Sequence, residues 1–163
     1  MMRSLKHLCS GDWQLRRAFP QQALSNIEAA IQQSELTHQG EIRFAVEAGL
    51  DLWPLLKNQT ARDRALQVFS ELRVWDTENN NGVLVYLLLS DRDIEIIADR
   101  GLNTKIAQQT WDSICREMKR MFLDEKFEEG VIAGIRAISQ DLAKLYPKRP
   151  RDINELPDRP AVL

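Results

Sequence analysis

Two strands joined by a short turn are the clearest prediction from the order of apolar and polar residues. Gly82–Leu89 is a nearly unbroken apolar run, which is typical of a strand buried on both faces. Asp93–Ala98 follows a charged turn and alternates apolar with polar residues. A turn this short makes the two strands antiparallel neighbours. We therefore expect residues 80–82, at the start of the first strand, to lie close to residues 99–101, after the second.

An earlier segment, Glu41–Ala48, alternates more strictly. It predicts a third strand that is either half-exposed or has a polar face that lines something. A helix over about residues 60–72, opened by a capping box of Thr60 and Asp63, connects this strand to Gly82–Leu89. Strands joined through a helix are usually parallel, with a right-handed crossover, so we expect these two strands to be parallel.

Apolar stripes of helical spacing predict three further helices. The first covers residues 20–35. The second is expected to be capped by Asn103 or Thr104 and to end near residue 124. The third runs from Phe127 to Leu145. The predicted fold is α/β: a three-layer α/β/α sandwich with a small mixed sheet. This sheet consists of two parallel strands plus an antiparallel hairpin strand.

The third helix also carries Gly130 and Gly134, one turn apart. Glycine costs about 1 kcal/mol in a helix interior, so we expect both to be there for close packing against a neighbour.

The chain divides into a lead-in over residues 1–19, a domain over residues 20–147 and a tail over residues 148–163. The tail holds three prolines and charges of both signs, so we expect it to be disordered and to contribute nothing to stability. Two readings of the lead-in stay open. As a basic amphipathic segment it makes weak contact with an anionic membrane surface, or it packs on the domain as a helix through Leu5, Leu8 and Trp13.

Composition narrows the function classes. The chain has 163 residues, 44% of them hydrophobic and 28% charged, with a formal net charge of −2, as in an ordinary soluble globular protein. This charge gives no electrostatic attraction to nucleic acid. No segment approaches the roughly 20 apolar residues of a membrane span, and no signal peptide is evident, so we expect a cytoplasmic protein. Two widely spaced cysteines and two histidines make zinc binding and a catalytic triad poor explanations.

Oxygen-bearing side chains are the remaining chemical resource. If the strands pair as predicted, Asp76, Asn81 and Asp99 lie at one end of the sheet, and Gly82 and Gly101 let main-chain carbonyls turn inward. Hard cations prefer such carboxylate, amide and carbonyl oxygens, so these three residues are the candidate site for calcium or another divalent cation. The alternative is that Asp76 and Glu78 cap the turn and that Asp99 pairs with Arg100 or an N-terminal amide.

Three segments resemble the TPM-domain family, which includes the thylakoid acid phosphatase and photosystem II repair proteins. They are residues 37–46, residues 81–102 with their Asn-Gly-Val-Leu strand and Arg-Gly-Leu turn, and residues 127–134. The resemblance implies an α/β/α sandwich, a calcium site and a weak phosphatase activity toward phosphomonoesters. Many family members are secreted or membrane-tethered, whereas this chain resembles the short, free-standing bacterial branch.

Three functions follow as hypotheses. The first is an accessory or binding domain that holds a divalent cation and contacts an unknown protein partner. The alternative is a weak metal-assisted phosphomonoester phosphatase that uses the same acidic end of the sheet, where carboxylates and Arg100 are present but a nucleophile is not evident. The third is an interaction domain with no ligand.

Overall fold

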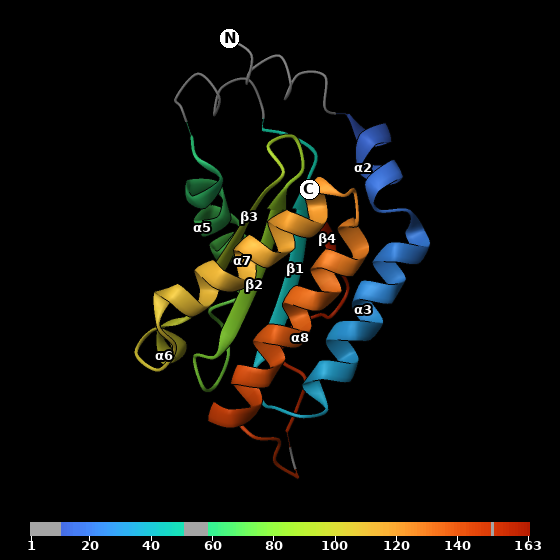
Figure 1. The fold of residues 1–163 in the computed structure, drawn as a ribbon. Coiled ribbons are helices and arrows are strands. Elements are labelled where there is room, and N and C mark those ends of the chain that lie inside the picture. Colours follow the sequence, from blue (N-terminus) through green and yellow to red (C-terminus); the bar gives the residue numbers. More distant parts are fainter. Residues whose placement is uncertain (1–10, 51–58, 151) are drawn as a thin grey trace.

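The computed structural model describes residues 11–50, 59–150 and 152–163. Within them it has helices on both sides of one sheet (Figure 1). In chain order the elements are α2 (Asp12–Ala18), α3 (Gln21–Glu35), β1 (Glu41–Glu47), α5 (Ala61–Glu71), β2 (Gly82–Leu88), β3 (Asp93–Ala98), α6 (Arg100–Asn103), α7 (Gln108–Leu123), α8 (Phe127–Leu145) and β4 (Ala161–Val162).

The sheet has the strand order β3-β2-β1-β4. β1 and β2 are parallel, with Glu41 opposite Gly82 and Glu47 opposite Leu88. β2 and β3 are antiparallel, with Val83 opposite Ala98. The three predicted strands, their bounds to within a residue and their relative directions are therefore confirmed.

Two apolar clusters sandwich the sheet. Side chains from α3, α7 and α8 pack on one face, against Phe44, Val85 and their neighbours. Side chains from α5 pack on the other face, against Ala45, Leu84 and Tyr86. Figure 1 shows α7 and α8 crossing in front of the sheet, with α5 on the far side. The predicted three-layer α/β/α class is confirmed.

Glycines in α8 allow the closest helix contact, as expected. A Cβ on Gly130 would lie 2.7 Å from a ring carbon of Phe122, and one on Gly134 would overlap the sulfur of Met118. Both neighbours are on α7 and are buried. The two long helices therefore pack at a distance that side chains at these positions would prevent.

Two details of the helix predictions are wrong. Neither Asn103 nor Thr104 caps the long helix, because the chain first forms the short α6, and Ala107 is the N-cap of α7. Asp99 initiates α6 by accepting the backbone N–H of Arg100, a local capping bond that competes with the predicted start.

In the lead-in, Trp13 is 61% exposed rather than packed on the domain, and Leu5 and Leu8 lie outside the described residues.

The expectation of a disordered tail is also wrong. β4 pairs with β1 in parallel, opposite Ala45 and Val46, and Leu156 is buried against the α5 side of the sheet. The side chains of Glu41 and Arg43 on β1 are buried beneath this segment. Composition gave the wrong prediction because the segment docks mainly through main-chain hydrogen bonds rather than through many apolar side chains.

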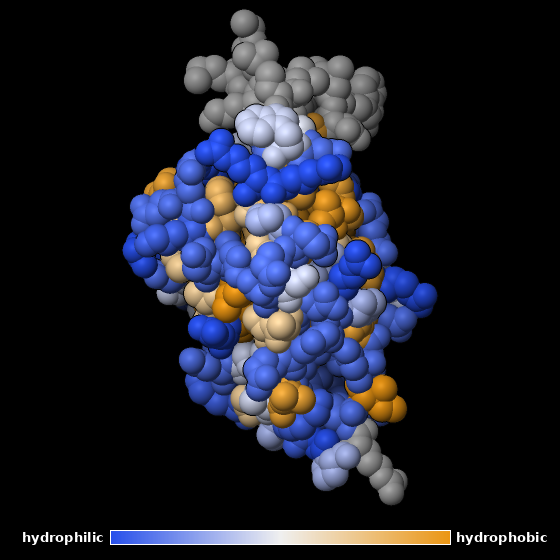
Figure 2. All heavy atoms as spheres, turned by 90° about the vertical axis from the view of Figure 1, so that its right-hand side faces the viewer, coloured by the Kyte–Doolittle hydropathy of each residue, from blue (hydrophilic) through white to orange (hydrophobic). Residues whose placement is uncertain are grey.

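The face on the α2–α3 side of the molecule is mostly hydrophilic. Its apolar side chains lie in small, separate groups (Figure 2). Broad apolar patches mark many protein interfaces, and the described residues form none on this face.

Gly82 sets a steric limit at the sheet end. A Cβ there would collide with the backbone carbonyl oxygen of Val74, which cannot move away as a flexible side chain can. We expect Gly82→Ala to lower the free energy of unfolding by about 3 kcal/mol, as overpacking does, measured by chemical denaturation. Gly11→Ala, where the nearest atom lies 3.6 Å from the added carbon, is the control and should change stability little. A Gly82→Ala protein as stable as wild type would contradict this steric limit.

Candidate functional site

The candidate site lies where β2 begins and β3 ends. The Asp99 N–H donates to the Gly82 carbonyl over 2.9 Å, and the Gly101 N–H donates to the Asn80 carbonyl over 3.0 Å. The Arg100 Nε donates to Asn80 Oδ1 over 2.9 Å. The predicted approach of residues 80–82 to residues 99–101 is confirmed, and the hairpin is its cause.

Asp99 is the buried carboxylate of this region, with 8% of its surface exposed. Its Oδ1 accepts the Arg100 backbone N–H over 2.7 Å. Its Oδ2 is buried and has no hydrogen-bond partner among the described residues. The Arg100 guanidinium binds Asn80 instead. Of the two partners that the sequence suggested for Asp99, the structure therefore shows the backbone amide and not the Arg100 side chain. One carboxylate oxygen is left for a ligand.

Asn81 is completely buried. Its Nδ2 donates to the Gln39 carbonyl over 2.9 Å, while its Oδ1 has no partner among the described residues. By strand alternation Asn81 follows the face of Val83 and Asp99 the face of Ile97, and these two residues belong to opposite apolar clusters. The backbones of Asn81 and Asp99 are thus neighbours, whereas their side chains leave the sheet end on different sides.

Asp76 lies on the turn after α5, half-exposed. Its Oδ2 is 2.7 Å from Arg73 Nη2 in an ion pair, and Arg73 lies over the ring of Trp75. These contacts do not bring its carboxylate to Asn81 or Asp99, so its place in the site stays a prediction. Among the described residues, no three His, Cys, Asp or Glu side chains gather to hold a metal ion. Any cation here would depend on main-chain and amide oxygens as well.

Main-chain oxygens are available beside Gly101. A Cβ at this position would lie 2.5 Å from the Asn80 carbonyl oxygen and 2.7 Å from the Asn79 carbonyl oxygen. The carbonyls can approach this closely only because residue 101 has no side chain. Carbonyl and carboxylate oxygens are the donor types that calcium prefers. Asp99 and these carbonyls thus carry oxygens of the kind that a hard divalent cation takes, at the same end of the sheet.

Three comparisons with known proteins bear on this chain. A family model for the TPM domain matches residues 16–141. The chain belongs to the TPM domain family. No curated protein matches it.

Two solved structures resemble this TPM domain. The NMR structure of the BA42 protein from the psychrophilic bacterium Bizionia argentinensis is 30% identical, with a TM-score of 0.77, over 87% of this chain and 93% of that one. The N-terminal domain of a protein from P. gingivalis is 20% identical, with a TM-score of 0.58, over 72% of each chain. The second likeness supports the fold alone.

No helix in the described part of this TPM domain is long and apolar enough to cross a membrane.

Burial changes the acid–base properties of His38 and Cys115 in this TPM domain. Burial chiefly lowers the pKa of His38 to about 4, so its imidazole is neutral at pH 7. Burial chiefly raises the pKa of the Cys115 thiol to about 11, so little reactive thiolate forms. Neither group therefore has a pKa near neutral pH.

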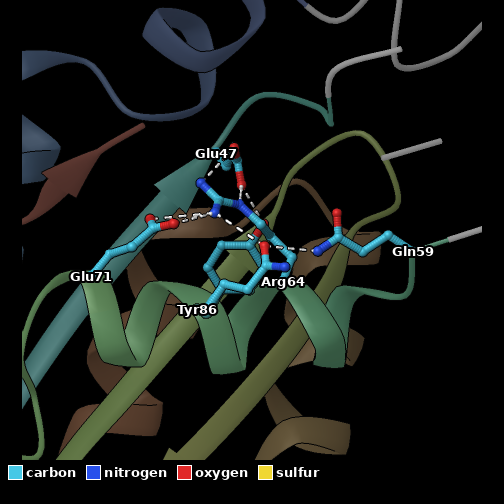
Figure 3. A network of polar contacts seen from close by, with 6 residues as sticks. Glu47, Gln59, Arg64, Glu71 and Tyr86 are labelled. Carbon is cyan, nitrogen blue, oxygen red and sulfur yellow. Dashed lines mark hydrogen bonds and ion pairs between the residues drawn. The ribbon is translucent and has the colours of Figure 1, made fainter. Parts of the chain in front are cut away.

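A second polar network lies at the other end of β1 (Figure 3). Glu47 accepts bonds from Arg64 Nε over 2.9 Å and from the Tyr86 hydroxyl over 2.6 Å. Arg64 also pairs with Glu71 over 3.0 Å. Burial, followed by the bond to Glu47, raises the pKa of Tyr86, which keeps its hydroxyl a donor. Because each of these groups is paired, the network fastens α5 to the sheet rather than offering a ligand site.

A third cluster, of which sequence reasoning singled out neither Glu35 nor Arg43, surrounds the start of β1. Glu35 accepts the Ile42 N–H over 2.9 Å, while Glu41 and Arg43 face residues 155–159. Burial chiefly raises the pKa of Glu35 to about 9, with Glu41 and Asp158 raising it further. Burial also raises the pKa of Glu41 to about 7. The signal for this cluster in the sequence was the alternation of β1. Of the two interpretations given for that strand, the structure agrees with the one in which its polar face lines something.

Stability should depend on pH through these carboxyl groups. Both folded-state pKa values lie above the ordinary 4.5, so the native state binds more protons than the unfolded state. This contribution is fully present below about pH 4.5 and is lost as pH rises through about 7 for Glu41 and about 9 for Glu35. We expect a loss of up to about 1.4 kcal/mol per pH unit for each group as it titrates, measured by chemical denaturation between pH 5 and pH 9.

Glu35→Gln should flatten the upper half of this pH dependence, because glutamine does not titrate. Glu129→Gln, at an exposed position of α8, is the matched control and should retain it. Stability that is constant from pH 5 to pH 9 in wild type would contradict the role of the buried pair.

Proposed function

We propose that this TPM domain is an accessory module that binds a divalent cation, with calcium the favoured ion, at the sheet end where β2 begins and β3 ends. The observation that carries the proposal is the buried Asp99 Oδ2, which has no hydrogen-bond partner among the described residues. The accessory role includes a protein partner, which this site does not specify. The cytoplasmic location predicted from the sequence belongs to the same proposal.

Energetics favour an ion at Asp99. A buried acceptor without a partner costs about 1–3 kcal/mol, and more when it is charged. A divalent cation removes this cost and gains the carbonyl oxygens of Asn79 and Asn80, which flank Gly101. Calcium takes six to eight oxygen ligands, so water would complete its shell. A site with one carboxylate and several waters is expected to bind weakly, in the range of roughly 10⁻⁴–10⁻³ M.

Binding is favoured over catalysis by the same contacts. Phosphoryl transfer needs an activated nucleophile and free positive charge beside the metal. Here the Arg100 guanidinium is engaged with Asn80, and His38 is neutral at pH 7 because its pKa lies near 4. In this proposal the cation orders the turn between α5 and β2.

Thermal and chemical unfolding after EDTA treatment, with and without millimolar calcium, magnesium or manganese, test the proposal. An ion that binds only the folded state raises stability by about 2.7 kcal/mol at a hundredfold excess over its dissociation constant. We expect Asp99→Asn to lose most of this gain while the metal-free protein stays folded. If all three ions leave wild-type stability unchanged, the proposal is wrong.

Asp124→Asn is the matched control, since it removes the same charge at an exposed position in the turn between α7 and α8. The ion pair of Arg92 with Glu125 places that turn beside the far end of the β2–β3 hairpin. Asp124→Asn should keep the full gain. Asp76→Asn and Asn81→Ala then decide whether these two residues share the ion, because only a ligand's loss reduces the gain. Turnover of para-nitrophenyl phosphate that EDTA abolishes would favour the phosphatase alternative.

A further inference from the structure

Two buried charged residues of β1 bind main chain rather than side chains. Glu41 Oε1 accepts the Glu155 N–H over 3.2 Å, and its Oε2 accepts the Leu156 N–H over 3.1 Å. Arg43 Nη1 donates to the carbonyls of Pro157 and of Arg159, the latter over 3.0 Å. The Glu41 carboxylate and the Arg43 guanidinium thus bind main-chain donors and acceptors of residues 155–159.

The segment over residues 152–163 is held as a peptide ligand is held. Its strand β4 has two residues, and the Leu163 N–H donates to the Val46 carbonyl over 3.0 Å. Leu156 is its buried apolar anchor, whereas Ile153 is 75% exposed and Val162 is 50% exposed. Binding through main-chain hydrogen bonds to a strand edge, with one pocket for a side chain, is the pattern of β-augmentation.

We propose that the edge of β1, with Glu41 and Arg43, is a binding site for an extended peptide, and that residues 152–163 occupy it in cis. The occupant it fits has an apolar anchor in the place of Leu156 and small apolar residues in the register of Ala161 and Val162. When the cis segment leaves, β1 becomes the edge strand of the sheet and presents its unpaired backbone groups.

Release is feasible because the docked state keeps two charges out of water. Glu41 is 3% exposed and Arg43 is 7% exposed. Burial chiefly lowers the pKa of Arg43, against the favourable effect of Asp158. Water regained by both charged groups compensates for hydrogen bonds that are lost on release. In the peptide, Pro157 and Pro160 restrict the free chain, which reduces the entropy cost of binding.

The test uses the full chain with Leu156→Asp, which removes the anchor of the cis segment and leaves β1 unchanged. A fluorescent peptide of residues 152–163 should bind this variant at least tenfold more tightly than wild type, measured by polarisation. Wild type binds weakly because the tethered segment competes at a high effective concentration. Ile153→Asp, at an exposed position, is the matched control and should behave as wild type.

Recognition of the backbone is tested in the same background. Adding Arg43→Met to Leu156→Asp should weaken peptide binding at least tenfold, and a peptide that itself carries Leu156→Asp should not bind. A folded Leu156→Asp protein that binds the peptide no better than wild type would overturn the proposal.

Hydrogen exchange on wild type gives an answer even if Leu156→Asp fails to fold. The amides of Leu156 and Leu163 should exchange through a local opening, at least tenfold faster than the amides of the β1–β2 ladder. Equal protection of the two sets, at the level of global unfolding, would show that the segment never leaves the folded domain and would overturn the proposal.

Discussion

The double burial of β2 is the constraint on which the rest of the structure depends. Every residue of this strand is buried, and alternate side chains contribute to the two apolar clusters on opposite faces of the sheet. A strand of this kind has little freedom of register, because a slip of one residue exchanges its two faces. Its pairing with β1 and β3 therefore places Glu41 beside Gly82 and Ala98 beside Val83. Both ends of the sheet acquire their polar groups as a consequence of this pairing.

Buried charge is treated in three different ways around this sheet. Glu47 is surrounded by side-chain donors, Glu41 accepts two backbone donors from residues over 100 positions away, and Asp99 uses one of its two oxygens. The first two arrangements hold a helix and a C-terminal segment against the sheet. Of these three carboxylates, only Asp99 leaves an oxygen without a hydrogen-bond partner among the described residues. Two residues later in the chain, carbonyl oxygens lie close to Gly101. The contrast singles out Asp99 among these carboxylates.

The sequence could predict what depends on near neighbours. The hairpin, the Thr60–Asp63 capping box and the packing glycines of α8 each follow from residues a few positions apart. The docking of residues 152–163 could not be predicted, because its donors and acceptors to β1 are mostly backbone groups, which any sequence carries, and its partners on β1 are 114 positions away or more. For the candidate site, the approach of the backbones was predictable from the turn. That the side chains of Asn81 and Asp99 leave the sheet on different faces could be known only from the register of β2 and β3.

The position of β4 has a consequence for the order in which the chain folds. Pairing of β2 with β3 needs a loop of only a few residues, whereas β4 must find a strand made more than 100 residues earlier. During synthesis the outer edge of β1 is therefore complete long before the segment that covers it. An open strand edge can pair with other chains. Glu41 and Arg43 lie on that strand, and their charges discourage such pairing until residues 152–163 have been synthesised and cover it.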